Sequence, residues 1–242
     1  RTLVLLDGVP MNDPYGGYVY WTRVPKDSVS RVEVVRGAGS NVWGNLAMAG
    51  VINIFTAPPT SKTLNVNAMA GTSDTMNLNL FASDVLSPVA VSVSGDYYDS
   101  DGYVVWRPED RGLVDEPTHK KFETFTTKIE TPISTRSSFF FTGSYFSEDH
   151  AKGTAFRDEY TDILSFVAGV DLRTEGESNW DLNVWTNDKG SEKWDSSIAR
   201  GHTSETLSEY TEQPAFALGT SAVWSKRLGE NNELMSGVDW QW

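Results

Sequence analysis

The densest run of residues that could serve chemistry is RVEVVRGAGSNVWGNLAMAGVINIFT, residues 31–56, where four glycines separate two apolar runs. Glycines that follow a strand can form a loop that holds a phosphate, so a nucleotide site is the first interpretation to test. A dinucleotide site needs G-x-G-x-x-G at the start of a helix, and a P-loop needs lysine followed by serine or threonine. Here the third glycine comes late, no lysine follows, and a β-rich segment comes next. The stretch therefore favours two short strands joined by tight turns over a phosphate site.

Side chains that could bind a metal or act as nucleophiles are scattered along the chain. Carboxylates fill two predicted loops near 99–119 and 148–162, but no D-x-D-x-D-G pattern organises them for calcium, so solvated loops are the simpler interpretation. His119, His150 and His202 lie far apart and share no zinc-binding spacing. There is no cysteine and no G-x-S-x-G motif. We therefore expect no catalytic residues, no metal site and no cofactor.

Composition narrows the class of partner. The chain of 242 residues has a net charge of -13, which argues against nucleic acid because phosphates attract basic faces. It has no apolar run of about 18 residues, so a transmembrane helix is not expected, but barrel strands give a far weaker hydropathy signal. The chain opens on a strand without a signal peptide. We expect it to be an internal piece of a longer protein.

Residues 1–57 form the first predicted unit. A strand at 2–6 is followed by turn residues at 7–10 and by a loop from 12 to 21 around two glycines. This loop carries the aromatic residues Tyr15, Tyr18, Tyr20 and Trp21. Aromatic residues this dense in a loop form either a recognition surface or a cluster packed on the rest of the unit. The sequence leaves both alternatives open.

The double proline in Ala57-Pro58-Pro59-Thr60 marks a boundary, because proline cannot join a central ladder. After a linker at 58–62, the remainder, 63–242, reads as a series of strands with one apolar face and one face of Asn, Ser and Asp. Strands are predicted near 63–71, 76–85, 89–97, 120–131, 137–147, 162–173, 179–187, 215–227 and 233–242. In a soluble sandwich the apolar face would form the core, whereas in a membrane barrel it would face lipid.

The connections between these strands separate the two architectures. After the first hairpin, short and long connections alternate, with the long ones near 99–119, 148–161 and 188–214. Outer-membrane barrels have long loops at one end and tight turns at the other, while a sandwich has no reason for such alternation. Aromatic residues near the strand ends agree with an interfacial girdle: Tyr97, Tyr98, Tyr145, Trp180, Trp224, Trp240 and Trp242. The pattern favours a membrane barrel.

Two stretches of the first unit resemble the plug domain of TonB-dependent outer-membrane receptors. One is RVEVVRG at 31–37, followed by a small-residue turn, Trp43-Gly44 and AGVINI at 49–54. The other is LLDGVPMND at 5–13, which is similar to the strand and loop that precede it in the family. Ala38 stands where the family usually has proline, and Trp43 where it usually has tyrosine. These departures bear on the substrate class more than on membership.

The resemblance implies a mainly β fold, a transmembrane antiparallel β-barrel with a small α/β plug domain inside. The family's barrel has about 22 strands, of which about nine are expected here. On this basis residues 1–57 are the C-terminal part of the plug, 58–62 are a linker, and 63–242 are the N-terminal part of the barrel.

The resemblance also implies a function. It is the energy-coupled uptake of a bulky, scarce nutrient such as a siderophore, cobalamin or a glycan, across the outer membrane of a Gram-negative bacterium. The ligand would bind between the plug and the outer loops, with outer-membrane lipid around the barrel. The TonB complex of the inner membrane would pull on the plug through a segment ahead of Arg1. No bond in the ligand is made or broken, so the protein would not be an enzyme.

Site residues follow partly from the resemblance and partly from side-chain chemistry. The resemblance implies that Arg36, with Glu33, lies between plug and barrel wall, where barrel carboxylates would compensate its charge. For ligand contact we expect aromatic faces with a few polar groups, as is typical of wide pockets. The expected ligand-binding residues are Tyr15, Tyr18, Tyr20, Trp21, Asn41 and Trp43.

The alternative function is a soluble, secreted β-sandwich or adhesin whose acidic loops bind carbohydrate or a host surface. It predicts that the apolar strand faces meet each other in a core.

Overall fold

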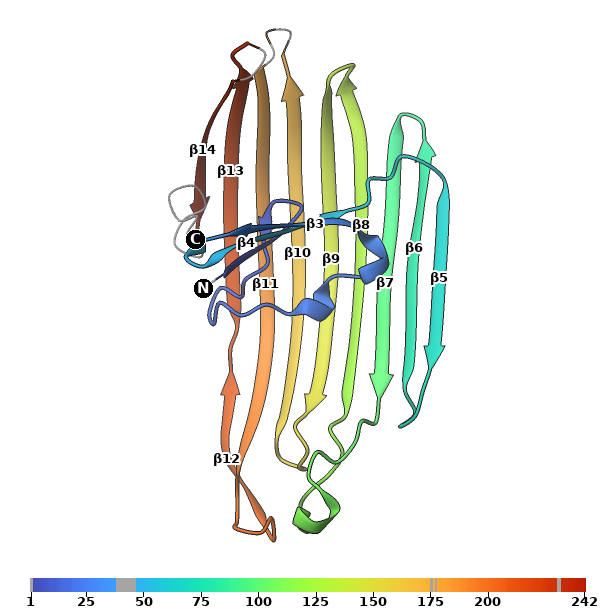
Figure 1. Ribbon diagram of the computed structural model, residues 1–242, viewed down its shortest axis with the longest axis vertical. Coiled ribbons are helices and arrows are strands. Elements are labelled where there is room, and N and C mark those ends of the chain that lie inside the picture. The colour runs from blue at the N-terminus through green and yellow to red at the C-terminus, as the bar shows by residue number, and fades with distance from the viewer. Residues whose placement is uncertain (1, 38–46, 175, 177, 230–231) are drawn as a thin grey trace.

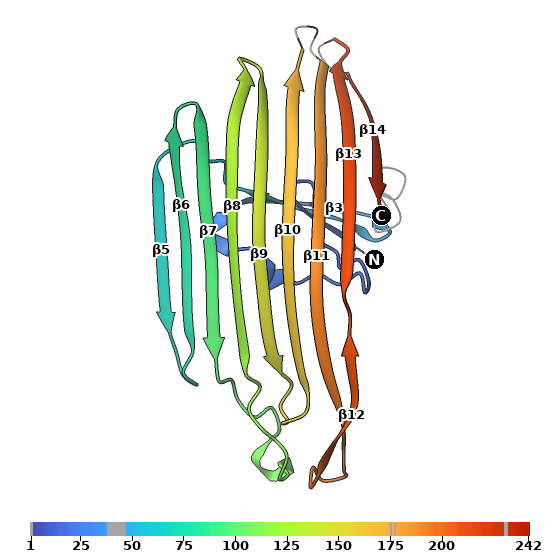
Figure 2. The same cartoon turned by 180° about the vertical axis from the view of Figure 1, so that it is seen from behind.

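Two β-sheets make up the chain. The computed structural model describes residues 2–37, 47–174, 176, 178–229 and 232–242. In Figure 1 the strands of the large sheet run vertically, and the strands of the small sheet lie across one face of it at mid-height. Figure 2, seen from behind, shows the large sheet in front and the small one beyond it. The small sheet therefore covers one face of the large sheet only.

The small sheet comes from the N-terminal residues and has the strand order β2-β1-β4-β3, with β1 parallel to β4 and the other pairs antiparallel. Its strands are β1 (Thr2–Leu6), β2 (Val9–Pro10), β3 (Val29–Arg36) and β4 (Gly50–Thr56). Two short 3-10 turns, η1 (Trp21–Arg23) and η2 (Lys26–Ser28), lie between β2 and β3.

Successive apolar residues of β1 are buried on opposite faces of the small sheet. Leu3 and Leu5 pack with Val51 on one side, and Val4 packs with Ile54 on the other. Successive side chains of a strand point to opposite faces, so a strand buried on both sides must be apolar throughout. Each such side chain contributes about 1.5–3 kcal/mol when it leaves water.

The large sheet is a ten-stranded antiparallel meander that begins just after the linker. Its strands are β5 (Thr63–Ala70), β6 (Met76–Leu86), β7 (Val89–Ser100), β8 (Lys120–Ser134), β9 (Ser137–Ala151), β10 (Asp158–Arg173), β11 (Ser178–Ile198), β12 (Glu205–Glu212), β13 (Ala215–Arg227) and β14 (Glu233–Gln241). Sequence neighbours pair throughout, except that β12 and β13 both pair with β11 and form one interrupted return strand.

The prediction of about nine strands with period-two alternation agrees with these elements, but two of the predicted long loops are wrong. The loop expected at 148–161 is only 152–157, because β9 continues to Ala151 and β10 begins at Asp158. Residues 188–214 are not a long loop, because β11 continues to Ile198 and β12 pairs with it from Glu205. The hairpin connection is only 199–204. Its strands carry many charged and polar residues, which hid the alternation from the sequence. A β-ladder tolerates them because both faces of this hairpin are partly exposed.

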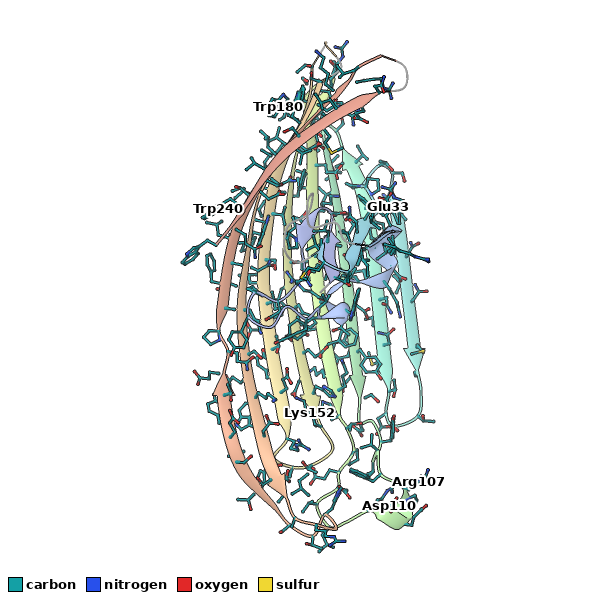
Figure 3. The ribbon with its side chains drawn as sticks, turned by 60° about the vertical axis from the view of Figure 1, so that its left-hand side comes forward. Glu33, Arg107, Asp110, Lys152, Trp180 and Trp240 are labelled. Carbon is teal, nitrogen blue, oxygen red and sulfur yellow. The ribbon has the colours of Figure 1, made fainter. Side chains whose placement is uncertain are left out.

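The two faces of the large sheet differ in chemistry. On the face toward the small sheet, Asn79, Ser94 and Ser165 are buried. On the opposite face, large apolar side chains remain exposed, including Leu78, Phe125, Leu164, Phe166, Val184 and Trp240. Figure 3 shows Trp240 projecting away from the sheet, on the side away from the small domain. The sandwich alternative requires the apolar faces of the strands to meet in a core. The apolar faces of the described strands do not.

The two ends of the large sheet also differ. The longer connections, 101–119, 152–157 and 199–204, lie at one end, together with the short turn at 71–75. The tight turns at 87–88 and 135–136 lie at the other end, together with the C-terminal ends of β10 and β13 (Figure 1). We refer to the first as the long-loop end. Among the described residues, no helix has the length and apolar composition needed to cross a membrane.

Gly50, at the start of β4, occupies a position that only glycine fits well. Its φ is +149°, and a Cβ there would lie 2.6 Å from the carbonyl oxygen of Val35 on the paired strand. Neither backbone can move away without breaking the β3–β4 ladder, in which Gly50 pairs with Arg36. Gly50, the last glycine of residues 31–56, therefore sets the register of the small sheet.

We predict that Gly50→Ala lowers the stability of the small sheet by about 1–3 kcal/mol, because it adds both backbone strain and a clash. Amide hydrogen exchange of β3 and β4 in the full-length protein measures this. The control is Gly176→Ala, where a Cβ would meet no atom within 4 Å. Equal exchange in the two variants would show that the position has no special requirement.

Candidate functional site

The loop from Asn12 to Trp21, which we call the aromatic loop, is folded by its first two residues. The buried side chain of Asn12 accepts a hydrogen bond from Val4 N (2.9 Å) and donates to the carbonyl oxygens of Thr2 and Gly17 (both 3.1 Å). Asp13 Oδ1 accepts hydrogen bonds from two amides of the next turn, Tyr15 N and Gly16 N. A short polar side chain that binds nearby amides is a common way to hold a turn.

Asp13 also fixes the loop to the large sheet. Its Oδ2 lies 2.7 Å from Nζ of Lys189 on β11, and the two side chains are 0% and 1% exposed. Lys189 donates a second hydrogen bond to the hydroxyl of Tyr18 (3.1 Å) and lies within 6 Å of the ring centroids of Tyr18 and Tyr20. A buried charge without a partner costs several kcal/mol. The pair therefore ties the loop to a single position on β11.

Two further residues extend the contact. Arg23, in η1, donates to Asn187 Oδ1 (2.6 Å) and to Ser165 Oγ. Burial lowers the pKa of Arg23 to about 10, while the charge of Asp13 acts in the opposite direction. Tyr20 packs against Phe146, and its hydroxyl lies 3.3 Å from the hydroxyl of Thr161. Burial raises the pKa of the Tyr20 hydroxyl. Arg23 stays cationic at neutral pH, so its polar partners on the wall are required.

The rest of the contact is polar as well. Thr22 donates to Glu148 on β9 (2.6 Å), and Lys26 donates to Asn77 on β6 (3.1 Å). Deeper between the sheets, Val9 packs with Trp185 and Ala217. A cavity of about 60 Å³ remains beside this apolar contact. The small sheet is thus held mainly through hydrogen bonds from residues 7–27, with one apolar patch.

The structure divides the residues expected to bind ligand. Tyr15 and Trp21 are 70% and 57% exposed, whereas Tyr18 and Tyr20 bind the wall through Lys189 and Thr161. Tyr18 and Tyr20 are thus packed, Tyr15 and Trp21 are free, and the recognition of a ligand by this loop stays a prediction. The other two expected residues, Asn41 and Trp43, lie outside the described residues.

Glu33 and Arg36, expected between plug and wall, lie on the exposed strand β3. Glu33 pairs with Arg31 (2.9 Å) on the surface of the small sheet. Among the described residues, no hydrogen bond or ion pair joins Glu33 or Arg36 to the large sheet. The strands described here do not cover β3, which is the edge strand of the small sheet, so the contact expected for Glu33 and Arg36 stays a prediction.

The residues that do make the contact were not singled out from the sequence. Asp13 belongs to the LLDGVPMND stretch, and Arg23 and Lys26 flank the aromatic loop. One signal was available: charged residues beside a loop expected to fill a polar barrel need partners on the wall. Their partners, Lys189 and Asn187, could not be paired with them because they lie more than 160 residues away.

The long-loop end is tied together by polar contacts of its own. His202 Nδ1 lies 2.6 Å from Asp115 Oδ1, and Trp106 packs edge-on against the His202 ring. Glu205 accepts hydrogen bonds from Thr154 and Ser196, both at 2.5 Å. These contacts link the connections 101–119, 152–157 and 199–204. In Figure 3 Arg107 and Asp110 lie at the tip of this end, and Lys152 lies between the tip and the small domain.

Comparison with known proteins agrees with this architecture. The family model described as TonB-dependent Receptor Plug Domain matches residues 1–51. The chain is 28% identical over 256 residues to the vitamin B12 transporter BtuB of Vibrio cholerae, covering 100% of this chain and 39% of that protein. It is 24% identical over 251 residues to BtuB of Vibrio vulnificus, covering 98% and 40%. The chain thus spans about two fifths of the length of these curated relatives.

Solved structures show the same fold. The siderophore receptor PirA from Acinetobacter baumannii superimposes with a TM-score of 0.77 at 15% identity, over 99% of this chain and 40% of that one. A ferric enterobactin receptor variant from Pseudomonas aeruginosa gives 0.74 at 15% identity, over 99% and 41%. The fold is therefore similar to that of a section of a plugged β-barrel. Residues 1–51 thus match the plug domain of TonB-dependent receptors, and the chain as a whole is similar to receptors of this kind.

We predict that Asp13→Asn in the full-length receptor loosens the aromatic loop. Asparagine keeps an acceptor for the amides of Tyr15 and Gly16 but leaves Lys189 buried and unpaired, which costs about 3–5 kcal/mol. Hydrogen exchange of residues 12–24 should rise accordingly. The double variant Asp13→Asn, Lys189→Met should recover part of the loss.

The control is Glu33→Gln, which breaks the exposed Arg31–Glu33 pair and should change exchange by less than about 1 kcal/mol. If residues 12–24 of the double variant exchanged as fast as those of Asp13→Asn alone, the buried ion pair would not be what holds the loop on β11.

Proposed function

We propose that this chain is the plug and part of the barrel wall of a receptor for energy-coupled uptake of a bulky nutrient. In this proposal residues 1–57 belong to the plug, 58–62 are the linker, and 63–242 belong to the barrel. The protein lies in the outer membrane of a Gram-negative bacterium, its apolar outer face in lipid. The TonB complex of the inner membrane supplies the energy by pulling on the plug.

One observation carries the proposal. The aromatic loop is fixed to the wall by buried contacts on one side, while Tyr15 and Trp21 stay exposed on the other. Along β11 its anchor, Lys189, is nearer the long-loop end than Trp185, which packs against Val9. The free aromatic side chains therefore lie at the plug surface that meets material arriving past the long loops. A rigid platform with exposed aromatic faces suits a large ligand.

A plug that moves also needs a mainly polar contact with the barrel wall, such as the one made by residues 7–27. Hydrogen bonds and ion pairs between plug and wall can be exchanged for hydrogen bonds to water, whereas a large apolar interface could not be opened without exposing it. The docking of residues 7–27 is mainly polar, with Val9 against Trp185 as the apolar exception. This supports a plug that stays in place at rest and yields to force.

The nature of the ligand is suggested by relatives but differs among them. The similar curated proteins are vitamin B12 transporters, and the similar solved structures include siderophore receptors. Cobalamin, a siderophore or a glycan therefore each fit the proposal at this level. We further propose Tyr15 and Trp21, with Asn41 and Trp43, as ligand contacts, and Tyr18 and Tyr20 as residues that support them from the wall.

We predict that Tyr15→Ala with Trp21→Ala in the full-length receptor weakens ligand binding about tenfold, since each lost aromatic contact is worth about 0.5–1.5 kcal/mol. Affinity for cyanocobalamin and ferric enterobactin is measured by calorimetry, and uptake is measured in cells with and without TonB. Tyr210→Ala, an exposed tyrosine on β12, is the control. Uptake that does not depend on TonB would contradict the proposed function, and unchanged affinity in the double variant would contradict the site.

A further inference from the structure

The inner wall beyond the aromatic loop, toward the long-loop end, carries lysines that are each matched by a carboxylate. Lys120 lies 3.1 Å from Glu148, and Lys193 lies 2.5 Å from Asp195. Lys152 forms a third pair, with Glu159. All six side chains are partly exposed, between 15% and 35%. They form a surface that a ligand can reach.

Strand alternation places these pairs on the inner face. Glu148 accepts a hydrogen bond from Thr22 of the plug, so it faces inward. Lys193 is four residues from Lys189, whose side chain reaches the plug, and therefore points the same way. Glu159 is two residues from Thr161, which contacts Tyr20. The three pairs thus continue the wall that holds the plug.

Further charged side chains lie close to these three pairs. Arg157 and Lys152 both act on Asp195, and Glu209 on β12 is the register partner of Asp195. His150 lies between Lys120 and Glu159 in the ladder. Among the described residues, no group of three or more metal-ligating side chains gathers here. Cationic and anionic side chains are thus mixed along the part of the wall near the long-loop end.

The outer face of the same strands is different. Glu123, Asp162 and Asp188 lie at outward positions. Glu123 is two residues from the exposed Phe125, Asp162 is two residues from the exposed Leu164, and Asp188 is the register partner of Leu164. Among the described residues, no ion pair compensates these three carboxylates. Part of the net charge of -13 is therefore carried by the outer face.

Charge pairing decides which ligands the wall can attract. A ligand with several negative charges is captured by cations whose field is not cancelled nearby, whereas a lysine within about 3 Å of a carboxylate presents a dipole whose field falls off steeply. Such dipoles offer hydrogen-bond donors and acceptors side by side, which suits amides and hydroxyls. The stacked rings of Tyr98 and Phe122, 5.3 Å apart, add an apolar face on the same wall.

We infer that the ligand of this receptor is electrically close to neutral, rich in amide or hydroxyl groups, and large enough to span paired charges and aromatic faces. A corrinoid and an oligosaccharide have this chemistry, while a ferric catecholate, with several negative charges, does not. The inference rests on the proposed function and deepens it by naming the chemical class of the substrate.

The first test measures binding to the full-length receptor in detergent with three probes: cyanocobalamin, maltohexaose and ferric enterobactin. At least one neutral probe should bind, with a Kd that changes less than about twofold between low and high salt, because screening has little net charge to act on. Ferric enterobactin should not bind. Binding of ferric enterobactin with a steep salt dependence, or failure of both neutral probes at millimolar concentration, would overturn the inference.

The second test removes the compensating carboxylates. Glu148→Gln, Glu159→Gln and Asp195→Asn together leave three lysines uncompensated, so ferric enterobactin should bind at least about tenfold more tightly at low salt than to the unaltered receptor, and lose this gain at high salt. The matched control carries Glu123→Gln, Asp162→Asn and Asp188→Asn on the outer face and should show no gain. Equal behaviour of the two triple variants would overturn the inference.

These outcomes are separable from failure of the proposed function. TonB-dependent uptake of ferric enterobactin would confirm a transporter and overturn the neutral-ligand inference. Binding of a neutral probe without TonB-dependent uptake would do the reverse.

Discussion

A single buried ion pair, Asp13 with Lys189, fixes the position of the aromatic loop on the large sheet. Asp13 shapes the aromatic loop through backbone amides and anchors it through its second oxygen, so the fold of the loop and its docking share one side chain. The pair is almost inaccessible to water, and neither charge can be relocated without losing its ion-pair partner. Tyr18 and Tyr20 complete the enclosure of Lys189. The exposure of Tyr15 and Trp21 follows from this anchoring.

The strands of the large sheet impose a second constraint, because each must serve two environments at once. Asn79, Ser94 and Ser165 point toward the plug and are buried, while Leu164 and Phe166, at alternate positions on β10, are exposed on the other face. A polar inner wall can hold a plug reversibly, and an apolar outer wall suits lipid. The same alternation continues past the aromatic loop, where it separates balanced charges inside from uncompensated carboxylates outside. The fold and the proposed ligand preference thus both depend on the alternation of side chains between the two faces of each strand.

The balance of charge along the inner wall also explains why composition is a poor guide to the ligand. A strongly acidic chain suggests a preference for cations, yet Lys120, Lys152 and Lys193 each lie beside a carboxylate on the wall that we propose the ligand meets. Part of the excess of acidic groups lies at outward positions such as Glu123 and Asp188. What a ligand experiences is the local pairing of charges, because fields from compensated pairs fall off within a few ångströms.

Much of the architecture could be predicted from the sequence because its signals are local. Period-two alternation located the strands, the double proline located the boundary of the small sheet, and Gly50 marked a backbone conformation that other residues avoid. The prediction failed at the hairpin formed by β11 and β12, where charged residues obscure the alternation and pairing depends on the partner strand.

The sequence by itself determined the order of the elements, the two-faced character of the strands and the presence of an aromatic loop. Only the tertiary structure decided which aromatic residues stay free, that Asp13 meets Lys189, and that Glu33 and Arg36 lie on an exposed edge within this chain. The reason is physical. Secondary structure follows from neighbours within a few residues, whereas charge compensation and burial depend on groups that a meander of strands brings together from positions more than a hundred residues apart.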